Sequence, residues 1–229
     1  MFLCSLIALA FVQHVPHSNP LKILFIGNSL TNYNDMPGMV KNLLESDGSG
    51  RKVVVRSHFY GHLDQAVEVP AILEEVEDPK WDFVVLQGAM ISMSMSREYS
   101  QDPGIKLATA ARRAGSQVIL YVEWPRRGID ESDFSVSQYQ RIQRSVPGVL
   151  MAPACYTWES TLKAHPKLPA YDNDGNHSKP VGSYIAAITI YERVVGPLSA
   201  DPKWLIEGVD RKLQQEIRGY AKAANKRVQ

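Results

Sequence analysis

The stretch LKILFIGNSLT, residues 21–31, carries the pattern that decides the fold. It begins as a nearly continuous apolar run and reaches a glycine at Gly27. A short apolar run of this kind is typical of a strand that is buried on both faces of a parallel sheet. Such a strand delivers the residues that follow it, here Asn28 and Ser29, to the carboxyl edge of the sheet, where α/β folds place their binding crevices.

Similar apolar runs and intervening helical patterns continue along the chain. Further strands are predicted at residues 52–57, 81–86, 117–123 and 148–152. Apolar residues at helical spacing predict helices at residues 36–45, 63–77, 98–114, 133–144, 180–195 and 202–224. Parallel strands need crossover connections, so this alternation predicts an α/β fold, a three-layer α/β/α sandwich with a five-stranded parallel sheet. The flavodoxin-like strand order 2-1-3-4-5 is the expected topology.

Composition places the chain among packed globular proteins with one domain. Its 229 residues are 45% hydrophobic and 21% charged, which is a normal balance for a chain with a sizeable core. We therefore expect a single domain over residues 21–229. The formal charge of +1 is too small to steer the protein onto nucleic acid or an anionic membrane, so no nucleic-acid partner is expected.

The N-terminal residues have the character of an export signal. Residues 1–12 are uncharged and mostly apolar, too short to span a bilayer but suited to a signal peptide, although no basic residues precede them. Residues 1–20 are thus predicted to be a signal peptide and linker, with export and no stable membrane insertion after signal removal. Only Cys4 and Cys155 are present, so removal of the signal would leave no intramolecular disulfide.

Ser29 is the candidate nucleophile, but its own motif is weak. Asparagine and serine after a strand are common in turns and helix caps. A second segment changes this interpretation, because Asp174 and His177 lie three residues apart in the polar loop before the helix predicted at 180–195. At that spacing the carboxylate can orient the imidazole, which can then accept the serine proton. The competing interpretation is that this loop only builds turns and caps a helix, but that role does not require a histidine.

These two segments resemble the SGNH (GDSL-like) hydrolases. ILFIGNSLT, residues 23–31, is similar to the block that carries their catalytic serine, and DNDGNHSKPVGSYIAA, residues 172–187, is similar to their Asp-x-x-His block. The order of the blocks and the α/β alternation between them also fit the family. The resemblance implies a triad of Ser29, His177 and Asp174, and it covers residues 21–195.

The resemblance also implies an oxyanion hole formed with the serine amide. Gly61 occupies the place of the family's glycine after the second strand. After the third strand the family has an asparagine, whereas this chain has Gln87, which is the nearest side-chain donor but has a longer arm. Trp124 and Arg126, which follow the fourth strand, are weaker candidates for substrate contacts, and His62 is a candidate pocket residue.

The predicted function is that of a serine esterase that forms an acyl-enzyme. The resemblance implies short acyl esters as substrates, with O-acetyl groups of carbohydrates favoured for an exported protein and thioesters and lysophospholipids as alternatives. Neither a metal nor an organic cofactor is implied, because no Cys/His spacing resembles a zinc site and the Gly27 loop has too few glycines for a phosphate cradle. The alternative is a non-catalytic α/β binding module for a glycan or small ligand. In that case Gln87, in place of the family's asparagine, no longer gives the site the geometry that stabilises an oxyanion.

Overall fold

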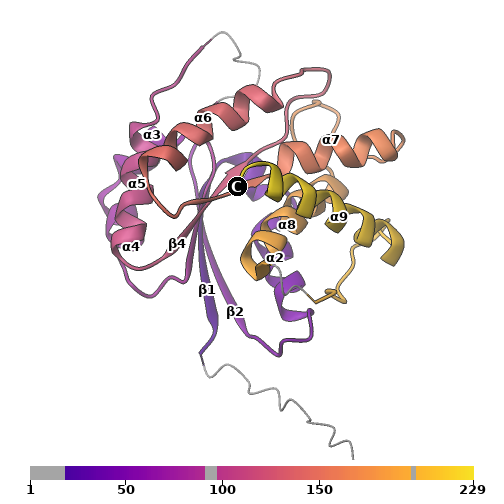
Figure 1. Ribbon diagram of the computed structural model, residues 1–229, viewed down its shortest axis with the longest axis horizontal. Helices are drawn as coiled ribbons and strands as arrows, with labels where there is room; N and C mark the ends of the chain where they lie inside the picture. The colour runs from indigo at the N-terminus through magenta and orange to yellow at the C-terminus, as the bar shows by residue number, and fades with distance from the viewer. Residues whose placement is uncertain (1–18, 91–96, 197–199) are drawn as a thin grey trace, which may run out of the picture.

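Five parallel strands form the central sheet in the order β2-β1-β3-β4-β5, as the sequence predicts (Figure 1). The strands are β1 (Leu21–Gly27), β2 (Val53–Phe59), β3 (Phe83–Leu86), β4 (Gln117–Val122) and β5 (Leu150–Pro153). The computed structural model describes residues 19–90, 97–196 and 200–229. Most of the predicted signal peptide, residues 1–18, lies outside the described residues and stays a prediction.

Helices cover both faces of the sheet (Figure 1). On one face lie α3 (Leu63–Val67), α4 (Pro70–Val76), α5 (Asp102–Arg113) and α6 (Ser132–Ser145). On the other lie α2 (Met36–Glu45), α7 (Ala154–Ala164), α8 (Pro180–Val195) and α9 (Arg211–Arg227). The arrangement is the predicted three-layer sandwich. A short helix, α1 (Ser29–Asn32), and a 3-10 turn, η1 (Tyr33–Asp35), connect β1 to α2.

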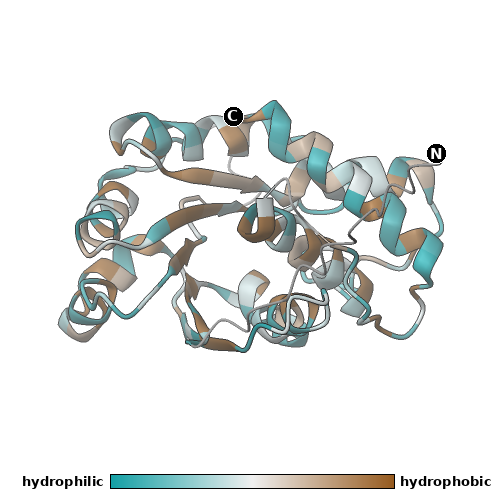
Figure 2. Cartoon of the chain, turned by 60° about the horizontal axis from the view of Figure 1, so that its bottom comes forward, coloured by the Kyte–Doolittle hydropathy of each residue, from teal (hydrophilic) through white to brown (hydrophobic). Residues whose placement is uncertain are grey.

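Alternate residues of the central strands point into two separate hydrophobic cores, one on each face of the sheet. In β1, Leu24 and Ile26 pack on the side of α3–α6, whereas Ile23 and Phe25 pack on the side of α2 and α8, and all four are buried. This alternation explains why β1 is apolar throughout, since a strand covered on both faces has no solvent side. Figure 2 shows the strands as brown bands, with teal concentrated on the outer helices.

The helix α8 is buried more completely than a surface helix. Thirteen of its 16 residues are buried, and it packs against α2, α7 and α9. A helix that is apolar on all sides can be stable only where neighbours cover every side. Its amino end follows directly after Ser178, so this rigid element anchors one side of the loop that carries His177.

Two helix predictions were wrong in detail, and one helix was not predicted. Residues 63–77 form two helices, because Pro70 lacks the N–H that a continuous helix needs and instead begins α4. The helix predicted at 202–224 begins only at Arg211, where Asp210 caps it. The helix α7 was not predicted, because it follows β5 directly with Pro153 at its cap and has no polar capping residue to mark its start.

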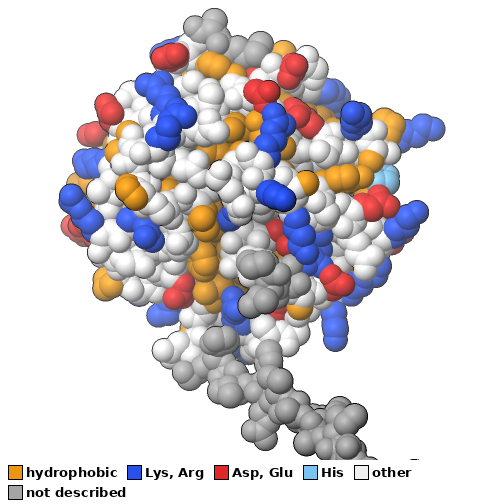
Figure 3. Space-filling model, viewed as in Figure 1, with side chains coloured by type: hydrophobic (Ala, Val, Ile, Leu, Met, Phe, Trp, Pro, Cys, Tyr) orange, Lys and Arg blue, Asp and Glu red, His pale blue; other side chains and the backbone are white. Residues whose placement is uncertain are grey.

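Charge is spread evenly over the face seen in Figure 3, where basic and acidic side chains are interspersed. This agrees with the formal charge of +1 and gives no large basic area on that face. Within the described ranges, no helix is both long enough and apolar enough to cross a membrane.

Candidate active site

Ser29 stands at the carboxyl edge of the sheet, directly after β1. The Asn28 side chain accepts a hydrogen bond from the Leu30 amide (2.9 Å) and so caps α1, of which Ser29 is the first residue. The Ser29 side chain is exposed at this cap. The Ser29 amide, being the first N–H of a helix, has no intrahelical acceptor and is available to an anion at this end of α1.

The loop that carries Asp174 and His177 folds back on itself. Tyr171 and Ser178 form an antiparallel bridge, and the Asp172 amide donates to the His177 carbonyl (2.8 Å). Within this turn, one carboxylate oxygen of Asp174 accepts from the His177 amide (2.9 Å). The loop therefore fixes the aspartate and the histidine relative to each other before their side chains interact.

Ser29, His177 and Asp174 form one continuous hydrogen-bonded chain. His177 Nε2 lies 2.9 Å from Ser29 Oγ, and His177 Nδ1 lies 2.5 Å from Asp174 Oδ2. Hydrogen bonding from His177 is the main cause that lowers the pKa of Asp174 to about 2, so the carboxylate is ionised at neutral pH. An ionised acceptor at Nδ1 favours the tautomer with its proton on Nδ1, which leaves Nε2 free to accept the serine proton.

The segment after Ser29 also holds His177. The Tyr33 ring stacks on the His177 imidazole, with ring centres 4.1 Å apart and planes 18° apart. The Asn34 side-chain amide donates to the Ser178 carbonyl (2.9 Å) and to Ser183 Oγ (2.9 Å). Neither Tyr33 nor Asn34 was a predicted site residue, because only the tertiary fold brings residues 33–34 beside residues 177–183.

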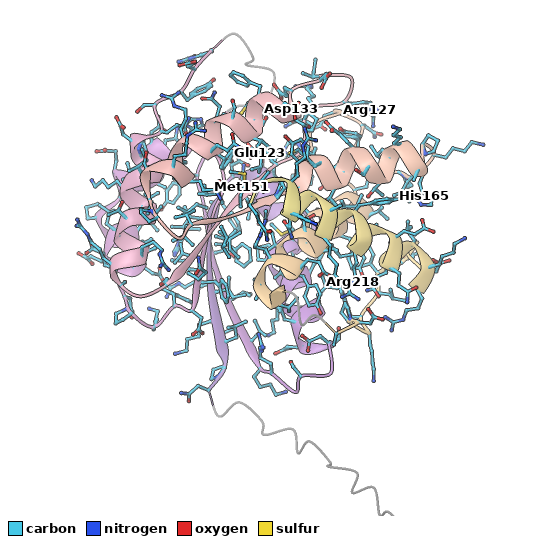
Figure 4. The ribbon with its side chains drawn as sticks, viewed as in Figure 1. Glu123, Arg127, Asp133, Met151, His165 and Arg218 are labelled. Carbon is cyan, nitrogen blue, oxygen red and sulfur yellow. The ribbon has the colours of Figure 1, made fainter. Side chains whose placement is uncertain are left out.

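The segment after β4 supports the Asp174 loop. The buried Trp124 indole donates to the Asn176 carbonyl (2.9 Å), and the Arg126 guanidinium donates to the Asp174 carbonyl (3.1 Å). Arg127, labelled in Figure 4, donates through its backbone amide to the Gly175 carbonyl (2.7 Å). Trp124 is only 1% exposed, so the predicted substrate contact by Trp124 is wrong. These residues orient the triad loop instead.

Gly61 lies beside the nucleophile loop, with its carbonyl 3.4 Å from the Asn28 side-chain nitrogen. Its amide, the expected oxyanion donor, donates to the exposed Gln65 side chain (2.9 Å). Donation to a substrate oxygen therefore requires Gln65 to swing away. The neighbouring His62 packs against the Tyr99 ring, and burial lowers the pKa of His62.

Gln87 lies beneath the nucleophile loop rather than at the surface of the site. Its side-chain oxygen accepts from the Asn28 amide (2.8 Å) and from Thr31 Oγ1 (2.8 Å), and the residue is 1% exposed. The prediction of Gln87 as an oxyanion donor does not fit this geometry, because its amide nitrogen is buried away from any substrate. Gly27 makes room for this arrangement, since a Cβ there would lie 2.2 Å from Thr31 Oγ1.

The described part of the chain offers little support for catalysis by a metal ion or by a cysteine nucleophile. No group of three or more His, Cys, Asp and Glu side chains there could hold a metal ion. The thiol of Cys155 is buried, and burial raises its pKa far above the usual range, which does not suit a nucleophile.

Solved structures with a similar fold include known and suspected hydrolases. A protein of Slackia heliotrinireducens, provisionally described as an SGNH hydrolase, is 26% identical over 77% of this chain and 100% of its own, with a TM-score of 0.58. A DUF4886 family protein of Bacteroides uniformis is 15% identical over 90% of this chain and 95% of its own, with a TM-score of 0.68. The psychrotrophic esterase EstA of a Pseudoalteromonas species is 18% identical over 76% of this chain and 96% of its own, with a TM-score of 0.53.

No protein-family model matches the sequence, and no curated protein is similar to it at a significant level. The structural comparisons nevertheless confirm the predicted fold: the chain has the architecture of the SGNH hydrolases. They also support hydrolase chemistry in general.

Proposed function

We propose that the protein is a serine ester hydrolase that forms an acyl-enzyme on Ser29. The observation that carries this proposal is the unbroken chain of hydrogen bonds from Ser29 through His177 to Asp174. A binding pocket does not need these three residues in a hydrogen-bonded chain. An acyl-transfer site does, because it requires a nucleophile, a base and a group that orients the base.

In the proposed reaction, Ser29 Oγ attacks the ester carbonyl while His177 Nε2 takes the hydroxyl proton. Asp174 stabilises the imidazolium that forms. The oxygen of the tetrahedral intermediate is held by the Ser29 amide and, once Gln65 moves, by the Gly61 amide. His177 then returns its proton to the leaving alcohol, and the acyl group stays on Ser29.

Hydrolysis of the acyl-enzyme repeats these roles with water as the nucleophile. His177 takes a proton from the water, which attacks the acyl carbonyl, and then returns that proton to Ser29 Oγ as the bond to serine breaks. The products are the carboxylic acid and the free enzyme. Every proton is exchanged between substrate, water, Ser29 and His177, while Asp174 stays ionised.

The substrates that we propose are short acyl esters, with O-acetyl groups on carbohydrates favoured. This choice rests on the family resemblance and on the predicted export of the protein, since extracellular glycans carry such groups. It is tested by comparing p-nitrophenyl acetate with p-nitrophenyl octanoate and with an acetylated xylan. Faster turnover of the acetyl ester and release of acetate from the xylan are expected. A preference for the octanoyl ester would contradict this choice and indicate lipid-like substrates instead.

Replacement of the nucleophile tests the reaction itself. Ser29→Ala is expected to lower turnover of p-nitrophenyl acetate by a factor on the order of 10⁴ or more, because the variant lacks the hydroxyl that forms the acyl-enzyme. Ser145→Ala, at the exposed end of α6, is the matched control and should leave turnover unchanged. Equal activity of the Ser29 variant and the wild type would remove Ser29 from the mechanism.

A binding module without catalysis is the second candidate, and the bond from the Gly61 amide to Gln65 favours it. If that bond persists when a ligand is bound, the oxyanion hole lacks a donor. Loss of one donor costs about 10²–10³ in turnover. Wild-type turnover and Gln65→Ala together separate the two functions. An enzyme should hydrolyse p-nitrophenyl acetate as the wild type and keep or raise its turnover in Gln65→Ala, whereas a module kept inactive by this bond should show no wild-type turnover and gain it only in the variant.

A further inference from the structure

Glu123 is a buried carboxyl group for which the proposed reaction has no role. It follows β4 directly and is 4% exposed. Figure 4 shows it in the interior of the molecule, close to α6. No basic side chain among the described residues acts on its pKa, although an isolated buried carboxylate is costly. Burial is the main cause that raises the pKa of Glu123 to about 7.

Tyr139 connects Glu123 to the loop that follows β3. Its hydroxyl donates to Glu123 Oε2 (2.6 Å) and accepts hydrogen bonds from the amides of Gly88 (2.9 Å) and Ala89 (3.2 Å). Gly88 has a φ of +97°, a conformation that favours glycine, and lies beside the Asn28 side chain. The hydroxyl therefore holds the backbone of a loop that borders the site.

Gln87 connects Glu123 to the nucleophile loop. Its side-chain oxygen faces the Asn28 amide and Thr31 Oγ1, so its amide nitrogen must face the other way. The Gln87 nitrogen is buried there without a hydrogen-bond partner among the described residues, and the Gln87 side chain is near enough to Glu123 to favour the ionised carboxylate. The orientation of the carboxamide is thus fixed by the two donors that its oxygen meets, which leave its nitrogen on the side of the Glu123 acceptor.

We propose that Glu123 is a positioning residue, which acts through Gln87 and Tyr139 to hold the nucleophile loop and the loop after β3 in the geometry needed for acyl transfer. This inference rests on the proposed function of Ser29. Glu123 itself does not touch the substrate. Its carboxylate accepts from Tyr139 and lies near the buried Gln87 nitrogen, and so it favours the orientation in which the Gln87 oxygen meets the backbone of Asn28.

A glutamine at position 123 cannot serve both neighbours. If its oxygen faces Tyr139, its amide group meets the amide group of Gln87, and two donors oppose each other. If its oxygen faces Gln87, the Tyr139 hydroxyl loses its acceptor. Glu123→Gln, which preserves size and shape, should therefore turn or displace Gln87 and disturb the Asn28–Ser29 backbone.

Exchanging the two side chains restores the pattern of donors and acceptors. In the double variant Glu123→Gln/Gln87→Glu, the carboxylate at position 87 can accept from the Asn28 amide, from Thr31 and from the new Gln at 123. The oxygen of that new carboxamide can then accept from Tyr139. Because the exchange again places a donor opposite an acceptor at each of these positions, it should restore catalysis that the single change removes.

The experiment measures kcat and KM for p-nitrophenyl acetate together with the rate of Ser29 labelling by a fluorophosphonate. Glu123→Gln is expected to lower kcat and the labelling rate on the order of tenfold to a hundredfold, with little change in KM, because a small misplacement of the nucleophile has effects of that size. The exchanged pair should recover most of the loss. Glu192→Gln, a change at a buried glutamate paired with Arg218, is the control and should leave kcat unchanged.

Each outcome points to a different conclusion. Wild-type protein that is folded but neither hydrolyses the ester nor becomes labelled would overturn the proposed function, and the role of Glu123 with it. Wild-type activity combined with normal kcat in Glu123→Gln, or no recovery in the folded exchanged pair, would overturn the positioning role alone. If Glu123→Gln does not fold, the nearly isosteric Tyr139→Phe provides the test. It should lower kcat without raising KM, and a normal kcat there would equally contradict the inference.

Discussion

At the scale of single residues, the candidate site depends on how few orientations each side chain can adopt. Asp174 accepts hydrogen bonds from the backbone of its own loop and from His177, so its carboxylate cannot turn freely. Tyr33 covers one face of the imidazole. A histidine held in this way needs little reorganisation during proton transfer, which is a main source of rate enhancement in such sites.

The low pKa of Asp174 makes its contribution to stability depend on pH. Its pKa falls from an ordinary value of 3.8 to about 2 in the folded chain, chiefly through the hydrogen bond from His177. A lowered pKa stabilises the folded state fully above about pH 4, and the contribution disappears as the pH falls towards 2. The difference in unfolding free energy between wild type and Asp174→Asn should therefore be constant near neutral pH and shrink below about pH 4.

Urea unfolding at a series of pH values measures this difference. Asp172→Asn is the matched control, since the Asp172 carboxylate caps the neighbouring Asn173 amide instead of meeting the imidazole. A difference for Asp174→Asn that grows as the pH falls from 4 to 2 would contradict the assigned hydrogen bond.

At the scale of elements, three segments from distant parts of the chain meet around the triad. The β1–α2 connection brings Ser29, the segment before α8 brings His177, and the segment after β4 supports the His177 loop through Trp124. The bracing of one loop by another explains how exposed loops can hold a geometry that catalysis requires.

Asn34 is the direct link between the first two of these elements. Asn34 and Asp35 have φ values of 56° and 51°, in the left-handed region that asparagine and aspartate tolerate better than most residues. Asn34→Gly keeps this backbone but removes the bonds to Ser178 and Ser183. We expect kcat to fall about tenfold, with KM nearly unchanged, because the variant loosens His177 relative to Ser29.

Steady-state kinetics of Asn34→Gly and Asn34→Ala measure this effect. Alanine removes the same hydrogen bonds and adds the cost of a left-handed non-glycine residue, about 1 kcal/mol, so it should unfold at a lower temperature than the glycine variant. Wild-type kcat in a folded Asn34→Gly would show that the link does not position the triad.

The sequence was most informative where the physical signal was local. Buried parallel strands are continuous apolar runs, so all five strands and their order could be predicted, and this prediction is confirmed. Ser29, Asp174 and His177 could be proposed from two motifs, and the structure brings them together, while their catalytic roles stay a prediction. Gln87 was misassigned, because its position after β3 does not reveal whether a long side chain points outward or folds beneath the neighbouring loop.

At the scale of the whole molecule, two cores on opposite faces of the sheet hold the layers together. The core that contains α8 is closely packed where Gly182 approaches α7 and the chain before α8. A Cβ at Gly182 would lie 2.4 Å from the Ala170 carbonyl oxygen and 2.4 Å from the Trp158 ring. Close packing of this kind leaves no space for even one methyl group.

Two glycine-to-alanine changes are predicted to have opposite effects on stability. Gly182→Ala should destabilise the protein by about 1–3 kcal/mol through overpacking. Gly219→Ala, in α9, should stabilise it by about 1 kcal/mol, because that glycine is exposed, has open space around it, and alanine is the better helix former. Urea unfolding measures both, and a stabilised Gly182→Ala would show that α8 is not packed as described.

The central claim is that Ser29 is an activated nucleophile, and mapping a covalent adduct tests it most directly. The folded wild-type protein is incubated with a fluorophosphonate and the modified peptide is identified by mass spectrometry. We predict a single adduct on Ser29, and none in Ser29→Ala or His177→Ala. No adduct on the folded wild type, or an adduct on another serine, would contradict the account.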